Sequence, residues 1–269
     1  MSAGVPFDRA VAFYDRTRSL PPEVSSAVAR LLAGELEGRG RALEGRGRAL
    51  EVGAGSGRIT LPLAARGIPL AAVDLSRPML EQLQRNAGGR APFPVAVADG
   101  LALPFPSGAF GASLTCHVLH LVAGWQGFLA EVVRVVRPGG VVLFDLGSEP
   151  PEIQETKERF AREAGLERVY VGMRDPVVLD RAMAGLGASA RLLEPIRFET
   201  RQRIRDVLRG YAGAQFSFTW VVEDEAVLRR AARATRAWAA GRFGDPDEQR
   251  TFVRTIQWRA YDLPGAAGA

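Results

Sequence analysis

Short apolar segments alternate with longer amphipathic segments over the first half of the chain. The apolar segments have the length of strands, and the segments between them carry apolar residues at helical spacing. Strands are expected, in order, at ALEV, GIPLAAVDLS, FPVAVADG, FGASLTCHVLHLV and VVLFDLG. Helices are expected at 22–36, around Leu61, at SRPMLEQLQRNA with Ser76 as its N-cap, and at WQGFLAEVVRVVRPGG, ended by Pro138 and Gly139. Such alternation is typical of βαβ units and predicts a parallel sheet.

The pattern becomes looser after Gly147. Helices are expected at 152–164, 176–186, 203–211 and 223–240. The segment ARLLEPIRFETR predicts a sixth strand, and alternating apolar and polar residues at 252–258 predict a last one. We therefore predict one domain over 1–269, with a core of about 45–199 and 249–263 and a helical cap from 1–36 and 200–248.

Composition narrows the class of protein. The chain has 269 residues, 47% of them hydrophobic, which is enough for a sizeable core. The net charge is +5, but the 34 arginines are scattered and mostly accompanied by acidic residues. A nucleic-acid surface needs clustered basic residues, so we do not expect nucleic acid as an obligate partner. No apolar run reaches the roughly 18 residues of a membrane span, and the N-terminus lacks a secretory signal, so we expect a soluble cytoplasmic protein. The oligomeric state is not indicated.

A glycine-rich turn follows the first expected strand. The segment EVGAGSGR places Gly53, Gly55 and Gly57 between a strand and a helix. Glycine lets backbone N–H groups approach a ligand, and the following helix N-terminus favours negative charge. In a doubly wound sheet this crevice lies at the carboxyl ends of the strands, where ligands bind. Asp74 ends the second strand and can accept both hydroxyls of a ribose, and Asp99 ends the third and can accept from an adenine amino group.

The spacing of this turn argues against a nicotinamide cofactor. The glycines follow G-x-G-x-G, and the G-x-G-x-x-G fingerprint would need glycine where Arg58 stands. Glu51 lies two residues before the first glycine and suits a ligand with a cationic amino group.

Four segments in this order resemble a known enzyme family. LEVGAGSGRITLPLA, AVDLSRPML, VADGLALPFPSGAFGASLTCHVLHLV and VVRVVRPGGVVLF resemble the motifs of class I S-adenosylmethionine-dependent methyltransferases of the type-11 group. They cover Leu50 to Phe144. The resemblance implies an α/β, Rossmann-like, doubly wound and mostly parallel seven-stranded sheet with a helical cap. It also implies S-adenosyl-L-methionine as cofactor and a small acceptor, lipophilic ones included.

The resemblance further implies roles for single residues. The backbone of the glycine turn would hold the methionyl part, Asp74 the ribose, and Asp99 the adenine edge. Tyr14 and Arg18 would close over the cofactor, Arg18 pairing with its carboxylate. The full set of expected cofactor contacts is Tyr14, Arg18, Glu51, Gly53, Ala54, Gly55, Gly57, Asp74, Leu75, Met79, Asp99, Gly100, Leu101 and His117.

Catalytic residues are harder to predict, because transfer from a sulfonium mainly needs alignment and exclusion of water. A base is needed only if the acceptor loses a proton, and His120 is the candidate for that role. The two histidines, His117 and His120, offer too few ligands for a metal, and the single cysteine, Cys116, is interpreted as a small apolar filler. Phe216, Phe218 and Trp220 alternate in FSFTW, so as a strand they would share one face. They are candidates for the acceptor pocket, or they anchor the inserted helices on the core.

Three other functions stay open. The excess of basic over acidic residues allows a methyltransferase that acts on RNA or protein. However, TCHV stands at the position where many amino-group nucleic-acid methylases carry NPPY. A nicotinamide-dependent oxidoreductase and a cofactor-binding module without chemistry are the others.

The heptad EGRGRAL occurs twice in tandem, at 37–43 and 44–50. Two copies are too few for a repeat fold, so we interpret the first copy as a duplicated loop. Its deletion is expected to leave cofactor binding intact.

Overall fold

The computed structural model describes residues 7–37 and 47–265. The chain divides into two compact units. The first contains the described residues up to 147, together with 172–196 and those from 257 on, and the second contains 148–171 and 197–256. These boundaries differ from the predicted core and cap, because the N-terminal segment belongs to the first unit and residues 148–171 belong to the second. Most of the tandem heptad lies outside the described residues.

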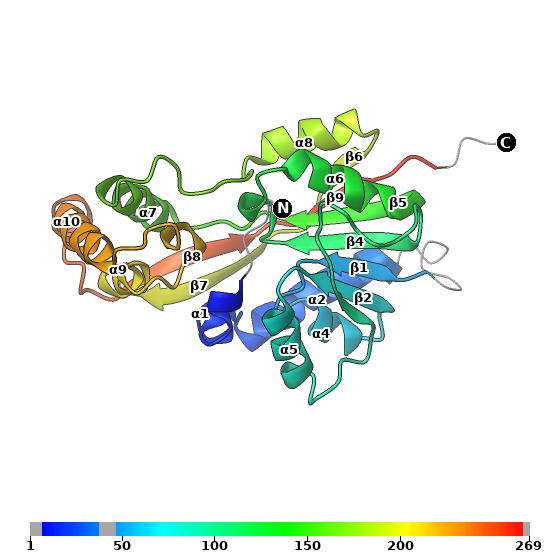
Figure 1. Cartoon of the computed structure of the whole chain (residues 1–269), viewed down its shortest axis with the longest axis horizontal. Helices are drawn as coiled ribbons and strands as arrows, with labels where there is room; N and C mark the ends of the chain where they lie inside the picture. Colours follow the sequence, from blue (N-terminus) through cyan, green and yellow to red (C-terminus); the bar gives the residue numbers. More distant parts are fainter. Residues whose placement is uncertain (1–6, 38–46, 266–269) are drawn as a thin grey trace. The chain divides into compact units, whose positions relative to one another are not determined.

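A seven-stranded sheet forms the centre of the first unit, in the order β3-β2-β1-β4-β5-β9-β6 (Figure 1). Its strands are β1 (Ala49–Val52), β2 (Leu70–Asp74), β3 (Val95–Val97), β4 (Phe110–Cys116), β5 (Val136–Asp145), β6 (Ser189–Leu192) and β9 (Arg259–Asp262). The pairs from β3 to β5 are parallel, and β9 is antiparallel to both of its neighbours. The predicted Rossmann-like, mostly parallel sheet is therefore confirmed.

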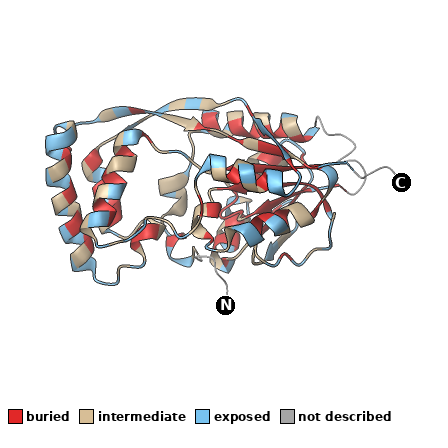
Figure 2. Cartoon of the chain, turned by 90° about the horizontal axis from the view of Figure 1, so that it is seen from above, coloured by how far each residue is buried: buried red, intermediate tan, exposed pale blue. Residues whose placement is uncertain are grey.

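Helices cover both faces of this sheet, and the alternation of side chains in β2 shows why. Ala71 and Val73 belong to one apolar cluster, which includes residues of α6 and α8, whereas Ala72 belongs to another, which includes residues of α5. The strands β1, β2 and β4 are almost wholly buried (Figure 2), as parallel strands between two helical layers must be. The helical segments are η1 (Asp8–Ala10), α1 (Tyr14–Arg18), α2 (Pro22–Glu37), α4 (Thr60–Ala64), α5 (Arg77–Asn86), η2 (Leu119–Leu121), α6 (Trp125–Arg134) and α8 (Pro176–Gly185).

Local sequence signals fix several of these boundaries. The Ser76 side chain accepts the N–H of Met79 at 3.3 Å, so the predicted N-cap of α5 is confirmed. Helix α6 ends at Arg134, before the predicted stop at Pro138, and β5 begins at Val136. The first pairs of β4 and β5 are irregular between Phe110 and Ala112, which gives the strand room for the proline and glycines.

The second unit contains three helices and a two-stranded sheet. The three α-helices are α7 (Pro151–Glu163), α9 (Ile204–Ala212) and α10 (Glu225–Phe243), and the strands are β7 (Ile196–Gln202) and β8 (Arg250–Ile256). A short 3₁₀ helix, η3 (Ser217–Thr219), lies between α9 and α10. Helix α10 packs against α7 and α9. Phe160, Tyr211 and Phe218 lie in its apolar cluster, with ring centroids 5.1–6.0 Å apart.

Three predictions of strands are wrong in detail. ARLLEPIRFETR forms two strands in different sheets, β6 and β7, because Pro195 lies between them and cannot continue a ladder. The closing segment likewise forms β8 and β9, interrupted at Gln257, whose side chain donates to the carbonyl of Leu193 at 2.7 Å. FSFTW is a short 3₁₀ turn rather than a strand, so its aromatic residues do not share a strand face.

No helix among the described residues is both long and apolar enough to cross a membrane.

Candidate functional site

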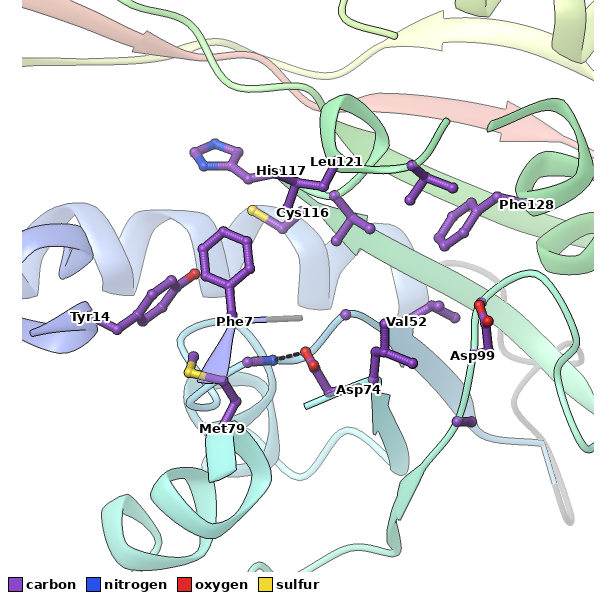
Figure 3. A pocket seen from close by; sticks show the side chains of 17 residues that line it. Phe7, Tyr14, Val52, Asp74, Met79, Asp99, Cys116, His117, Leu121 and Phe128 are labelled. Carbon is purple, nitrogen blue, oxygen red and sulfur yellow. Dashed lines mark hydrogen bonds between the residues drawn. The ribbon is translucent and has the colours of Figure 1, made fainter. Parts of the chain in front are cut away.

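A cavity lies at the carboxyl ends of β1, β2 and β4, at the point where the sheet order reverses (Figure 3). The space enclosed by its walls, together with its open mouth, is about 720 Å³. The lining residues are Phe7, Tyr14, Val52, Gly53, Gly55, Asp74, Leu75, Met79, Ala98, Asp99, Gly100, Cys116, His117, Val118, Leu121, Val122 and Phe128. Most of the cofactor contacts expected from the sequence are thus brought together.

The glycine turn forms the floor of this cavity. Gly53, Gly55 and Gly57 have φ values of +82°, +55° and +88°, which only glycine adopts readily. The N–H groups of Gly53 and Ala54 both donate to the carbonyl of Val73, at 2.8 and 3.0 Å. A Cβ at Gly53 would lie 2.3 Å from a methyl carbon of Val118. The turn therefore holds the ends of β1 and β2 together and leaves no room for a side chain.

Asp74 is fixed by two backbone donors. One carboxylate oxygen accepts the N–H of Gly55 at 2.8 Å (Figure 3). The other accepts the N–H of Ser76, also at 2.8 Å. Burial raises the pKa of Asp74, although these two hydrogen bonds oppose the shift. Each oxygen retains a lone pair for a further donor, so the carboxylate can accept a pair of hydroxyl groups.

Asp99 lies at the far end of the cavity from Tyr14 (Figure 3). Its carboxylate accepts the N–H of Leu101 at 3.0 Å. A Cβ at Gly100 would lie 2.3 Å from the ring of Phe128, so glycine allows that ring to approach. Leu101 itself packs on the apolar core and is not among the described lining residues of the cavity, which differs from its expected role.

The N-terminal segment contributes two aromatic rings to the cavity. Phe7 and Tyr14 line it and contact each other edge to face at 6.0 Å. Two aspartates hold this segment in place. Asp8 accepts from the Ser76 hydroxyl at 2.5 Å, and Asp15 accepts from Gln82 and Asn86 of α5 at 3.2 and 2.9 Å. Phe7 was not predicted from the sequence, because nothing in its neighbourhood distinguishes it from a core residue.

Glu51 is 2% exposed and lies on β1 next to the cavity wall. Its Oε2 makes no hydrogen bond with the described part of the chain. Burial raises the pKa of Glu51 to about 8, and hydrogen bonding with Thr60 and the positive charge of Arg58 only partly oppose this shift. A buried carboxyl group with an oxygen lacking a donor is costly unless a ligand supplies one.

Arg58 is the positive charge at this end of the site, and sequence reasoning missed it. Its guanidinium donates to the carbonyl of Arg18 at 3.2 Å and to the Cys116 sulfur at 3.2 Å, and contacts the His117 ring at 3.4 Å. Arg18, the predicted partner of a ligand carboxylate, is not among the described lining residues. The position of Arg58 in the sequence was a signal of its role. A positive charge just before a helix is disfavoured by the helix dipole, so an arginine there indicates a function other than stabilising the helix.

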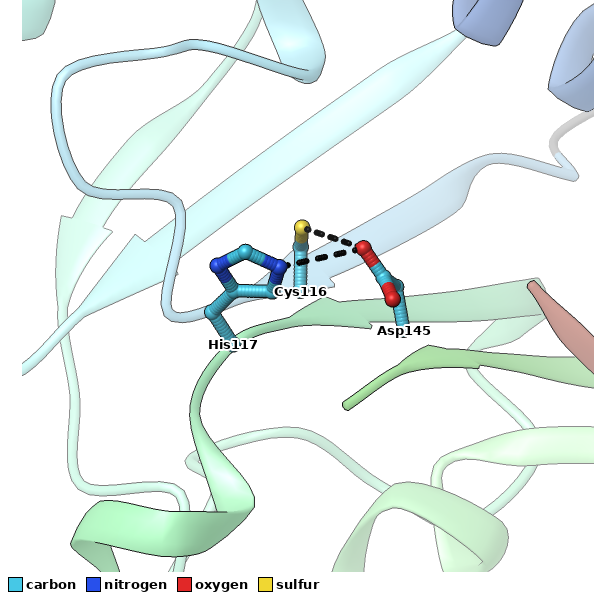
Figure 4. A group of neighbouring side chains, drawn as sticks. All are labelled: Cys116, His117 and Asp145. Carbon is cyan, nitrogen blue, oxygen red and sulfur yellow. Dashed lines mark hydrogen bonds and ion pairs between the residues drawn. The ribbon is translucent and has the colours of Figure 1, made fainter. Parts of the chain in front are cut away.

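Cys116, His117 and Asp145 form a compact group beside Arg58 (Figure 4). The Asp145 carboxylate lies 3.2 Å from His117 Nε2 and 3.7 Å from the Cys116 sulfur, and accepts the N–H of Gly147 at 3.0 Å. Burial strongly raises the pKa of Cys116, so the group is a thiol at neutral pH and a poor nucleophile. Within the described residues these three could share an ion, but they are one ligand short of a usual zinc site and Arg58 already contacts two of them. That the protein uses no metal stays a prediction.

The remaining candidates lie elsewhere. His120 is absent from the described lining of the cavity, and its carbonyl accepts the N–H of Gly172 at 3.0 Å. Phe216 and Phe218 belong to the apolar cluster of the second unit, and the Trp220 indole donates to the carbonyl of Ala214 at 2.8 Å. These contacts support the alternative in which the three aromatic residues anchor helices, and their role toward an acceptor stays a prediction.

Comparison with known proteins gives consistent matches. Residues 50–144 match the family model described as a methyltransferase domain. The chain is 34% identical over 134 residues to the demethylmenaquinone methyltransferase of Tropheryma whipplei, covering 50% of this chain and 54% of that protein. It is 31% identical over 138 residues to the malonyl-[acyl-carrier protein] O-methyltransferase of Salmonella typhimurium, covering 51% and 50%. The chain thus matches about half the length of these relatives. The fold is similar to that of the YcgJ protein of Bacillus subtilis, with a TM-score of 0.60, 15% identity, and coverage of 89% of this chain and 99% of that one.

Proposed function

We propose that this chain, whose residues 50–144 match the model of a methyltransferase domain, is an S-adenosylmethionine-dependent enzyme that methylates a small acceptor. One observation carries the proposal. The cavity lies on the segments that the family match covers, with the glycine turn, Asp74 and Asp99 on its walls. Fold alone would not indicate this function, because doubly wound sheets carry many activities.

The residues present fit the cofactor. Asp74 has lone pairs for the two ribose hydroxyls, and Asp99 can accept from the adenine amino group at the opposite end of the cavity. The buried Glu51 lacks a donor at Oε2, which an ammonium group would supply. Leu75 and Met79 line the cavity beside Asp74 and would pack on the adenine.

We assign the cofactor carboxylate to Arg58 rather than to Arg18. The Arg58 guanidinium lies against Cys116 and His117, both of which line the cavity. A guanidinium can bind a carboxylate through two parallel hydrogen bonds, and burial strengthens such a pair. Glu51 and Arg58 together would then recognise the zwitterionic end of the methionyl group.

The bound cofactor would supply a sulfonium with an electrophilic methyl group. The chain would align the acceptor with that group and exclude water, which is the main requirement of an in-line displacement. Phe7 and Tyr14 cover one side of the cavity and Val118 and Leu121 line another, so the protein already provides an apolar enclosure. An enclosure of this kind prevents hydrolysis and strengthens the electrostatic contacts inside it.

A small acceptor is supported by the names of the relatives, one of which acts on demethylmenaquinone and another on a malonyl group carried by a protein. Methylation of RNA or protein is the alternative, favoured only by the net charge of +5.

Calorimetric titration with S-adenosylhomocysteine, with NADH as the control ligand, tests the cofactor. Micromolar binding of the first ligand alone is expected, with loss of binding in Asp74→Ala and normal binding in Asp206→Ala, a control at a half-exposed position of α9. Transfer of tritium from methyl-labelled S-adenosylmethionine to a pool of small acceptors, compared with bulk RNA and protein, tests the acceptor. Binding of NADH instead, or no binding, would refute the proposal.

A further inference from the structure

His117 has a strained backbone at the edge of the cavity. Its φ of +58° is one of two positive values at non-glycine residues in the described part of the chain. Such strain persists only where the surroundings fix it, and it concentrates at functional sites. Here the His117 N–H donates to the Asp145 carbonyl at 2.8 Å and the ring contacts the carboxylate of the same residue. Asp145 therefore fixes both the backbone and the ring of His117.

The partners of the ring determine its tautomer. Arg58 lies at 3.4 Å from Nδ1, and a guanidinium can only donate, so Nδ1 is an acceptor without a proton. The proton must then be on Nε2, which donates to Asp145 at 3.2 Å. Burial opposes ionisation of Asp145, but its contacts with His117, Gly147 and Arg58 outweigh this and lower its pKa. An ionised Asp145 thus holds the imidazole with Nδ1 as its basic atom.

We propose that His117 is the general base of the methyl transfer, with Nδ1 as the proton acceptor and Asp145 as the positioning residue. The inference rests on the proposed function. It replaces His120, which lacks a place in the described cavity lining, by a histidine that lines the cavity and has a side chain 36% exposed. The Asp145 and His117 pair follows the arrangement in which a carboxylate orients an imidazole and stabilises it once protonated.

His117 would take the proton that the acceptor loses when it receives the methyl group. A lone pair of the acceptor would form the bond to the methyl carbon supplied by the bound cofactor, and the electron pair of the broken carbon–sulfur bond would stay on sulfur. The proton of the acceptor moves to His117 Nδ1 and then to solvent. The acceptor must therefore lose a proton, which indicates a phenol or enol hydroxyl as the reacting or activating group.

The charges around His117 come from three sides. Asp145 of β5 lies beside Nε2, and Arg58 lies beside Nδ1. Cys116 is a neutral thiol, while Glu51 and Tyr14 lie behind Arg58 and interact with its charge. The single lone pair of Nδ1 faces Arg58 in the free protein, so binding of the cofactor carboxylate by Arg58 would have to draw this donor away before Nδ1 can accept a proton from the acceptor.

The tautomer can be measured without an acceptor, because the chain has two histidines. Long-range ¹⁵N–¹H spectra of histidine-labelled protein, assigned with His120→Gln, are expected to show His117 with a proton on Nε2 and none on Nδ1. Asp145→Asn is expected to mix the two tautomers. A proton on Nδ1 of the free wild-type protein would overturn the proposal.

Kinetics tests the catalytic role. The variant is His117→Asn, since asparagine tolerates the left-handed backbone. With saturating tritiated S-adenosylmethionine and a panel of phenols (catechol, hydroquinone and 1,4-dihydroxy-2-naphthoate), kcat is expected to fall about 10²- to 10³-fold. The rise of kcat with pH should disappear in His117→Asn and persist in His120→Gln.

The outcomes separate this inference from the proposed function. Failure of the wild-type protein to bind S-adenosylhomocysteine would refute the function itself. Normal binding with an unchanged kcat in His117→Asn, or with methylation of amines and of no phenol, would refute the base alone. Asp145→Asn provides a second variant, whose expected smaller loss of kcat should accompany the change of tautomer.

Discussion

Glu51 makes a specific prediction about proton release. In the free protein its pKa is about 8 because the group is buried, so at pH 7 about 0.9 of the molecules carry the proton. An ammonium group placed against the carboxylate would lower the pKa by about 2, a usual effect of an opposite charge at close range. The protonated fraction would then be about 0.1, so binding of S-adenosylhomocysteine at pH 7 should release about 0.8 of a proton.

Calorimetry in buffers of different ionisation enthalpy measures this number directly, since the apparent binding enthalpy varies linearly with the buffer enthalpy and the slope is the proton count. Glu51→Gln should abolish the release. So should replacing the ligand by 5′-methylthioadenosine, which lacks the ammonium and carboxylate groups. A slope near zero for the wild-type protein, or an equal slope in Glu51→Gln, would refute the argument that Glu51 holds the ammonium.

The same group affects the stability of the free protein. A carboxyl group whose pKa is raised on folding binds its proton more tightly in the folded state. The ionisation of Glu51 therefore does not affect stability below pH about 4.5, and the protein should lose stability as the pH rises from there toward 8. The full effect is at most about 5 kcal/mol. Urea unfolding at pH 5 and pH 8 should show the loss in the wild-type protein and a smaller one in Glu51→Gln.

Three further changes follow from the contacts. Gly53→Ala should destabilise the first unit by about 3 kcal/mol and abolish binding, because φ is +82° and the added carbon meets a side chain at 2.3 Å; differential scanning calorimetry measures this, and an unchanged melting temperature would contradict it. Arg58→Gln should weaken S-adenosylhomocysteine binding at least about tenfold and leave the binding of 5′-methylthioadenosine unaffected, with Arg18→Gln as its matched control. Weaker binding in Arg18→Gln and normal binding in Arg58→Gln would instead assign the cofactor carboxylate to Arg18. Lys157→Met should destabilise the second unit by about 3 kcal/mol, since the lysine is 2% exposed and paired with Glu149; urea unfolding followed by tryptophan fluorescence would show it, and wild-type stability would contradict the assigned pair.

Much of the first unit could be predicted from the sequence, because its signals are local. The apolar strands, the Ser76 cap and the glycine turn each depend on a few neighbouring residues, and a parallel sheet brings the carboxyl ends of its strands to one edge. Asp74 and Asp99 reached the cavity for this reason.

The rest depends on contacts between distant segments. Asp145 lies at the end of a strand that the sequence predicts, but its contact with His117 requires β4 to pair with β5. The two residues are 28 positions apart in the sequence. The Arg58 side chain points toward Cys116, and no periodic pattern of residues in the sequence indicates this direction. The strands on either side of Pro195 join different sheets, a choice made by tertiary packing rather than by their composition.

The burial of Lys157 has a consequence for how the protein can be modified. It is the single lysine in the sequence, and its ammonium group contacts Glu149 and the Tyr170 hydroxyl in the interior of the second unit. Side-chain amines are the targets of acetylation, ubiquitin attachment and most amine-directed reagents. In this chain, reaction of the lysine side chain must await local opening of the second unit. Modification of Lys157 would therefore report the unfolding of that unit.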